Sequence, residues 1–364
     1  MARLTGRAIM ATSLIFILVL GLLGFSMGAA SGALCAFLAP IAVTPAESLL
    51  DSSTFSLKVA ETADRRLAKS PTQPGSDDRK EHADSNYVPP GYLKVFGDEF
   101  DKTQLDSQKW WTRYIYDDGK LDFLNDEQQR YRENNNHVMT GRTVSLMARK
   151  TVGDAAAYQS GMVRSKATFR YGYFEARMKV PGGRGVRPAF WLNSARRTSD
   201  GKIAWPPEID IAELVNNGVE DTTHMLHVGL ISHGPQQMEV IDADPAFHRD
   251  WNYLLVPTSL SDDFHVYSAL WENDDTVSIF LDGRRFYKAR YKWVYDDGSP
   301  AGYAHVILDL AIGGPKWAGR HGIDDAAFPQ GLEIDYVRVY QKVGQQMIGV
   351  DTVGKSLCPA RGGC

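Results

Sequence analysis

Short runs in which apolar and polar residues alternate are the feature of this sequence that most restricts its fold. They recur from Tyr87 to about Lys342 and are separated by Gly, Pro, Asn and Asp. A period of two places successive side chains on opposite faces of a β-strand. In 174–180 the apolar residues take one face and Glu, Arg and Lys take the other, which predicts a half-buried antiparallel strand.

Further strands follow from the same pattern. We expect them at 144–148, 265–272, 277–281, 305–312 and 332–341. The run at 277–281 ends at Asp282-Gly283, a pair that favours a hairpin turn. Many strands at short spacing, without a convincing long amphipathic helix, predict an all-β fold, a β-sandwich or jelly roll of one domain.

Charge and cysteine content exclude some function classes. The formal net charge is -4, from 40 basic and 44 acidic residues, so the chain lacks the positive excess that binds a phosphate backbone and nucleic acid is a poor partner. None of the three cysteines forms a CxxC pair, which excludes a zinc ribbon or a thioredoxin-type site. Cys358 and Cys364 can close a small disulfide loop in an oxidising compartment or stay as two thiols without a role.

The N-terminus has the pattern of an export signal. Arg3 and Arg7 are followed by no charged residue from Ala8 through Ala46, a stretch longer than an ordinary signal core. Residues 1–46 are therefore predicted to be a signal peptide or an N-terminal membrane anchor. Either outcome exports the rest of the chain, to the periplasm or the extracellular space.

Three further segments are expected after the leader. A flexible linker rich in charge, Ser and Pro occupies 47–86. The folded domain occupies 87–342, and a Gly-rich C-terminal tail occupies 343–364.

Three acids within six residues interrupt an otherwise apolar, β-branched run. On a regular strand Glu208 and Asp210 share one face, and the isoleucines that follow each of them share the other. Glu213 has the wrong parity. We therefore predict a β-bulge near Ile211 or Ala212, which returns Glu213 to the acid face.

Two glutamates that face one cleft can divide the acid and nucleophile roles needed to cleave a glycosidic bond. Asp210 between them can hold or share a proton and separate their pKa values. A flat strand with one bulged residue would separate the two glutamate Cα atoms by roughly 13 Å, so spacing alone leaves open whether such an enzyme retains or inverts configuration. The plain alternative is an exposed strand face on which the acids are merely solvated.

The surroundings of these acids resemble glycoside hydrolase family 16, the group of laminarinases, lichenases, agarases and carrageenases. The resemblance spans about residues 95–341, and Glu208-Ile209-Asp210-Ile211-Ala212-Glu213 is similar to the longer, bulged form of the family's active-site motif. The other matching segments, in order, are Phe96-Gly97-Asp98-Glu99-Phe100, Ser160-Gly161 with Tyr171–Arg177, Pro188-Ala189-Phe190-Trp191-Leu192 and Ile334–Tyr340.

This resemblance implies a concanavalin-like β-jelly-roll sandwich of two curved antiparallel sheets. It also implies an endo-acting, retaining hydrolase that cleaves internal β-glycosidic bonds of a polysaccharide, a β-glucan or a bacterial exopolysaccharide. By position in the motif Glu208 would be the nucleophile, Glu213 the general acid/base and Asp210 the residue that tunes the nucleophile. His227 matches a family histidine of the next strand, although a strand histidine satisfied within the core is an equal alternative.

Sugar rings pack their C–H faces on aromatic side chains. Trp205, Trp191 and Trp317 are the candidates, and Trp191 can equally belong to the core. Asn125 resembles the family's asparagine that contacts sugar hydroxyls, with a turn asparagine as the alternative.

Arg187 departs from the family pattern, because many β-glucan-cleaving members have a Trp directly before Pro-Ala-Phe-Trp. This weakens the expectation of a plain β-1,3-glucan. Arg187 together with Arg184 can pair with carboxylate, sulfate or succinyl groups of an acidic polysaccharide.

No cofactor is expected, and catalysis is expected to need no metal. Many family members carry a structural calcium near the first and last strands, where Glu99 and Asp335 fall, but the sequence has no dedicated calcium loop. The polysaccharide is the expected partner, and no protein partner is predicted. A non-catalytic, lectin-like jelly roll and a transglycosylase with the same site are the alternative functions.

Overall fold

The computed structural model describes residues 86–133, 135–195, 205–232 and 238–350. The predicted leader 1–46, the linker 47–86 apart from its last residue, and both tail cysteines lie outside these residues. Among the residues described, no helix is long and apolar enough to cross a membrane.

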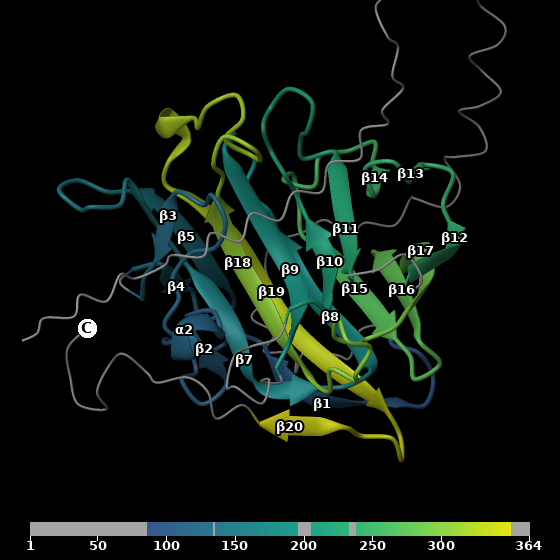
Figure 1. Cartoon of the computed structure of the whole chain (residues 1–364). Helices are drawn as coiled ribbons and strands as arrows, with labels where there is room; N and C mark the ends of the chain where they lie inside the picture. Colours follow the sequence, from purple (N-terminus) through teal and green to yellow (C-terminus); the bar gives the residue numbers. More distant parts are fainter. Residues whose placement is uncertain (1–85, 134, 196–204, 233–237, 351–364) are drawn as a thin grey trace, which may run out of the picture. The chain divides into compact units, whose positions relative to one another are not determined.

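Two β-sheets make up most of the described structure (Figure 1). The first sheet has the order β12-β17-β16-β15-β8-β19-β5-β6-β3, with β1 beside β19 and β4 beside β5. Its strands are β1 (Tyr92–Asp98), β3 (Gln129–Tyr131), β4 (His137–Met139), β5 (Val144–Lys150), β6 (Tyr158–Ser160), β8 (Gly172–Lys179), β12 (Met238–Ala243), β15 (His265–Trp271), β16 (Thr276–Leu281), β17 (Arg284–Tyr291) and β19 (Gln330–Lys342).

The second sheet has the order β13-β14-β11-β10-β9-β18-β7-β2, with β20 beside β7. Its strands are β2 (Trp110–Trp111), β7 (Met162–Phe169), β9 (Val186–Ser194), β10 (Glu208–Glu213), β11 (Met225–Ile231), β13 (Phe247–His248), β14 (Tyr253–Leu255), β18 (Ala304–Ile312) and β20 (Ile348–Val350). The described helical elements are a single turn α2 (Tyr116–Gly119) and a 3-10 turn η1 (Asp325–Ala327). Pairing is predominantly antiparallel, so the predicted all-β sandwich is confirmed.

The core lies between the two sheets and is built from the apolar face of each. The alternation predicted at 174–180 is observed in β8, where Phe174, Ala176 and Met178 are buried in this core. The expectation of a half-buried strand is wrong at Glu175, which faces the other way but is buried as well. Ile209 and Ile211 of β10 are buried in the same core from the second sheet. Because successive side chains alternate between the faces, Glu208 and Asp210 are directed to the opposite face.

The hairpin predicted at Asp282-Gly283 joins β16 to β17. Both turn residues have positive φ, 48° for Asp282 and 76° for Gly283. A two-residue turn of this kind twists in the same sense as the strands that it connects, and Asp-Gly tolerates the positive φ values.

Part of the segment assigned to the C-terminal tail is structured. The long strand β19 ends at Lys342, as the expected domain boundary does. The chain then turns, and Ile348–Val350 forms β20, whose partner is β7 at residues 167–169. In the eight tail residues that the structure describes, apolar and polar residues alternate too little to predict this edge strand from the sequence.

Core burial of β10 gives a testable consequence for stability. Ile209 is fully buried, so Ile209→Ala is expected to lower the free energy of unfolding by about 3 kcal/mol through lost apolar burial and the cavity left behind. The measurement is urea denaturation of the purified protein. Ile241→Ala is the matched control, because Ile241 is 46% exposed; equal losses in the two variants would contradict the assignment of β10 to the core.

Candidate active site

The three acids lie on β10, between β9 and β11 in the second sheet (Figure 1). Asp210 pairs with Trp191 of β9 and with Gly229 of β11. Beyond Asp210 both pairings shift by one residue, because Ala212 comes opposite Phe190. The predicted bulge is thus confirmed at 211–212. It places Glu213, like the first two acids, on the face away from the core, where all three are partly exposed.

The carboxyl groups of Glu208 and Asp210 interact directly, through a hydrogen bond and through their charges. The pKa of Glu208 is raised to about 7, and burial is the largest cause. The hydrogen bond from Trp205 Nε1 to Glu208 Oε2, 2.8 Å long, acts in the opposite direction. Burial, and then the charge of Glu208, raise the pKa of Asp210 well above its usual range. The hydrogen bond between the two carboxyls lowers the pKa of Glu208 and raises that of Asp210. Two carboxyl groups joined by a hydrogen bond need one proton between them, so the two side chains are not both ionised.

A glycine makes room for Asp210. A Cβ atom added to Gly229, directly across on β11, would lie 2.1 Å from Asp210 Oδ2. The backbone of β11 thus approaches the carboxyl group more closely than any side chain would permit.

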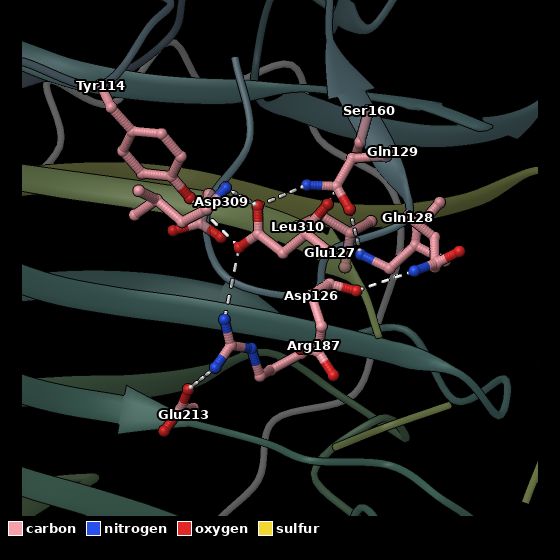
Figure 2. A network of polar contacts seen from close by, with 12 residues as sticks. Tyr114, Asp126, Glu127, Gln128, Gln129, Ser160, Arg187, Glu213, Asp309 and Leu310 are labelled. Carbon is pink, nitrogen blue, oxygen red and sulfur yellow. Dashed lines mark hydrogen bonds and ion pairs between the residues drawn. The ribbon is translucent and has the colours of Figure 1, made fainter. Parts of the chain in front are cut away.

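Glu213 forms an ion pair with Arg187, which projects from β9. Arg187 Nη1 donates to Glu213 Oε1 at 2.9 Å, and Arg187 Nη2 donates to Glu127 Oε1 at 3.3 Å (Figure 2). The side chain of Arg187 is 14% exposed and that of Glu127 is 3% exposed. Burial raises the pKa of Glu127, and the charge of Arg187 acts in the opposite direction. One guanidinium therefore compensates two carboxylates in a largely dry environment.

The contacts of Glu127 continue through buried hydroxyls to β18. The Tyr114 hydroxyl lies 3.4 Å from Glu127 Oε1 and 3.2 Å from the Tyr131 hydroxyl, which donates to Asp309 Oδ2 at 2.9 Å. Trp191 Nε1 donates to Asp309 Oδ1 at 2.7 Å. Burial, and then the charge of Glu127, raise the pKa of Asp309 to about 7. Side chains from four parts of the chain thus form one polar network. Figure 2 shows its connection from Glu127 through Arg187 to Glu213.

His227 lies directly across from Glu213 in the pairing of β10 with β11. Its Nε2 is 2.6 Å from Asp221 Oδ2, and its Nδ1 is 3.3 Å from the Trp251 carbonyl oxygen. Both partners are acceptors, so the imidazolium form satisfies both ring nitrogens. Burial would lower the pKa of His227, but the hydrogen bond and charge of Asp221 outweigh it and raise the pKa.

The predicted sugar platforms differ in their exposure. Trp205 is 40% exposed and Trp317 is 41% exposed, and the Arg187 guanidinium carbon lies 5.2 Å from the centre of the Trp317 ring. Trp191 is 7% exposed and packs with Tyr114 in a small apolar cluster. Trp205 and Trp317 are therefore exposed enough to contact a sugar ring. Trp191 is buried and instead donates its hydrogen bond to Asp309 of the polar network.

Asn125 occupies an exposed turn with a positive φ of 49°. Asparagine tolerates this conformation better than most residues do. The turn leads directly into Glu127, so Asn125 lies near the network whether or not it contacts sugar.

Glu99 and Asp335, near which the family resemblance places a calcium ion, are both hydrogen-bonded to arginines. Glu99 accepts two hydrogen bonds from Arg338, at 2.9 and 2.7 Å, and Asp335 accepts one from Arg177 at 2.6 Å. The described part of the chain has no group of three or more His, Cys, Asp or Glu placed to hold a metal ion. These side chains do not fit a calcium site.

Sequence reasoning left out several residues of this site. Asp309 lies in the apolar run His305–Ile312, and an acid in such a run is the same signal that singled out β10. Glu127 and Asp221 lie in loops without a pattern of their own. Trp251, which is 71% exposed, is linked through its carbonyl to His227, a contact that sequence spacing does not reveal.

The family model described as "Beta-porphyranase A-D, GH16 domain" matches residues 92–342. The chain belongs to glycoside hydrolase family 16. The resemblance predicted from the sequence is confirmed, and the chain is a glycoside hydrolase.

Several relatives of this hydrolase agree with the family. The Beta-glucanase of Rhodothermus marinus is 32% identical over 70% of this chain and 87% of its own length. The Glucan endo-1,3-beta-glucosidase A1 of Niallia circulans is 28% identical, and here the match covers 69% of this chain but 38% of the relative. The solved laminarinase from Rhodothermus marinus has a TM-score of 0.54 and 29% identity, covering 69% of this chain and 98% of that one.

The close approach of β11 to Asp210 predicts that the hydrolase is sensitive to a single methyl group. Gly229→Ala is expected to displace the Asp210 carboxyl and lower kcat/KM by about 10²-fold with little change in secondary structure. Gly97→Ala is the matched control, since an added Cβ there meets its nearest atom at 3.5 Å. The check is polysaccharide cleavage together with circular dichroism; full activity of Gly229→Ala would show that Asp210 needs no such space.

Proposed function

We propose that this glycoside hydrolase cleaves internal β-glycosidic bonds with Glu208 as nucleophile, Glu213 as general acid/base and Asp210 as the residue that keeps Glu208 ionised. The observation that carries the proposal is the bulge at 211–212, because it brings both glutamates to one face of β10. The hydrogen bond between the Glu208 and Asp210 carboxyl groups supports the division of roles, since a proton held by Asp210 leaves the charge on Glu208.

The reaction proposed has two steps and retains configuration. In the first, the Glu208 carboxylate attacks the anomeric carbon while Glu213 gives its proton to the departing glycosidic oxygen. In the second, Glu213 takes a proton from water, the water oxygen attacks the same carbon, and the bond to Glu208 breaks. Hydrolysis is favoured over a lectin-like role because the acids are partly buried and electrostatically coupled, which simple sugar binding does not need.

The substrate class proposed is a β-linked polysaccharide that is either a β-glucan or a modified, acidic polymer. The relatives named for glucans support the first, and the family model named for β-porphyranases supports porphyran as a further candidate. Two carboxylates already compensate Arg187. An acidic substituent would therefore more readily meet Arg184, whose Nη1 donates to the His321 carbonyl oxygen at 2.9 Å.

The site of action proposed is outside the cytoplasm. The arginines before the long uncharged stretch 8–46 support export. Fractionation of cells that produce the full chain, followed by N-terminal sequencing, would distinguish a cleaved signal from a retained membrane anchor.

Substitution of either glutamate tests the proposed chemistry. Glu208→Gln and Glu213→Gln are expected to lower release of reducing ends by at least about 10²-fold, because the amides keep the shape but cannot act as nucleophile or proton donor. The panel comprises laminarin, lichenan, agarose, carrageenan, porphyran and acidic bacterial exopolysaccharides. Unchanged cleavage by either variant would refute the assignment.

The same assay separates the alternatives. Binding without release by the wild type would favour the lectin-like role, and transfer to an added acceptor sugar would favour a transglycosylase. NMR of the first anomer formed tests retention, since an inverted product would exclude the covalent step at Glu208.

The hydrogen bond between Trp205 and Glu208 predicts a shift in pH dependence. Activity needs ionised Glu208, so kcat/KM should rise with pH through about 7, where the Glu208 pKa lies. Trp205→Phe keeps an aromatic face but removes a hydrogen bond that lowers this pKa, so the acid limb should move to higher pH by about one unit. Trp317→Phe is the control for loss of an indole; an equal shift in both variants, or none in Trp205→Phe, would contradict the prediction.

A further inference from the structure

The ion pair between Arg187 and Glu213 needs an explanation that substrate charge does not provide. Arg187 directs one nitrogen to Glu213 Oε1 and the other to Glu127 Oε1, at 2.9 and 3.3 Å. Its positive charge is thus already used within the protein.

Glu127, the buried partner of Arg187, is held in place by further hydrogen bonds. Glu127 Oε2 accepts from the backbone N–H of Leu124 at 2.8 Å and from Gln129 Nε2 at 2.9 Å. Gln129 Oε1 in turn accepts from the backbone N–H of Ile312 on β18 at 2.7 Å. Glu127 is therefore anchored to the second sheet on the side away from Arg187, and it gives the guanidinium a fixed point of attachment (Figure 2).

Glu213, the other partner of Arg187, directly follows the bulge at 211–212. Glu213 is paired again on both sides after the bulge, with Ala189 of β9 and His227 of β11. Its backbone is therefore fixed, while its long side chain still has several staggered rotamers to choose from. A guanidinium fixed on its inner side removes that freedom from Glu213, because a charge-assisted hydrogen bond is both short and directional.

We propose that Arg187 is a positioning residue for Glu213: anchored by Glu127, it binds Glu213 Oε1 and so assigns the transferable proton to Glu213 Oε2. The inference rests on the function proposed above, in which Glu213 protonates the leaving oxygen and then takes a proton from water. Arg187 touches neither the substrate nor the reacting atoms in this role. Its effect is confined to the steps that need a correctly aimed acid or base.

The first test compares two substrates that differ in their need for an acid. On the polysaccharide that the panel identifies, Arg187→Gln is expected to lower kcat/KM by about 10- to 100-fold. On a 2,4-dinitrophenyl β-glycoside of the matching oligosaccharide, pre-steady-state release of dinitrophenol should change by less than about 3-fold, because this leaving group departs without a proton. Equal losses on both substrates, or no loss on the polymer, would overturn the proposal.

The second test asks whether Arg187 acts through Glu213. In a double-mutant cycle, Arg187→Gln should cause no further loss of polymer cleavage once Glu213→Gln is present. A loss of the same size in both backgrounds would show that Arg187 contributes independently, for example by binding sugar, and would overturn the proposal.

Two variants guard against an effect of folding alone. Glu127→Gln keeps Arg187 but weakens its anchor, and it should reproduce the substrate selectivity of Arg187→Gln at a smaller magnitude. Arg177→Gln breaks a comparable arginine–carboxylate pair with Asp335, 2.6 Å long, in the first sheet, and it should leave the ratio of polymer to aryl-glycoside activity unchanged. Thermal unfolding of each variant confirms that the protein compared is folded.

The proposed function and this inference fail in different ways. If Glu213→Gln itself does not distinguish the polymer from the aryl glycoside, Glu213 is not the acid/base and both fall together. If Glu213→Gln distinguishes them and Arg187→Gln does not, the proposed function stands and the positioning role of Arg187 is wrong.

Discussion

Carboxyl groups that are held close together away from water are the constraint on which the rest of this structure depends. Each unpaired buried charge is costly, so such a group either takes a proton or meets a cation. Asp210 and Asp309 follow the first route, with pKa values raised by burial. Glu213 and Glu127 both contact one shared arginine, Arg187. Raised pKa values and pairing with an arginine are thus both present within one site.

The sandwich makes this sorting possible because its two faces have separate tasks. Apolar side chains of the second sheet, such as Ile209, complete the core against the first sheet. The opposite face is left for Arg187, Glu213 and Asp309, which come from three neighbouring strands, β9, β10 and β18. Only Glu127 comes from outside that sheet among these charged partners, and it reaches them through a turn that precedes β3. Fold and site therefore share the same strands without sharing the same side chains.

Sequence reasoning recovered the parts that depend on periodicity. Alternation located β8, β16 and β19, and the parity of Glu213 was sufficient to predict the bulge. Contacts between distant segments were beyond it, because neither the pairing of Arg187 with Glu127 nor that of His227 with Asp221 follows from spacing along the chain. Asp309 combines the two cases. Its position within an apolar strand can be recognised from the sequence, but its partners Tyr131 and Trp191 are identified only from the arrangement of the strands.

The bulge at 211–212 also has an evolutionary meaning. Both neighbours of β10 absorb the extra residue at the same point, so the strand is longer by one residue there without disturbing β9 or β11 elsewhere. Removing one residue would give a regular strand on which acids four positions apart already share a face. A single codon insertion or deletion therefore connects two forms of the strand with the same outward-facing acids, and lineages can pass between them without the acids leaving that face.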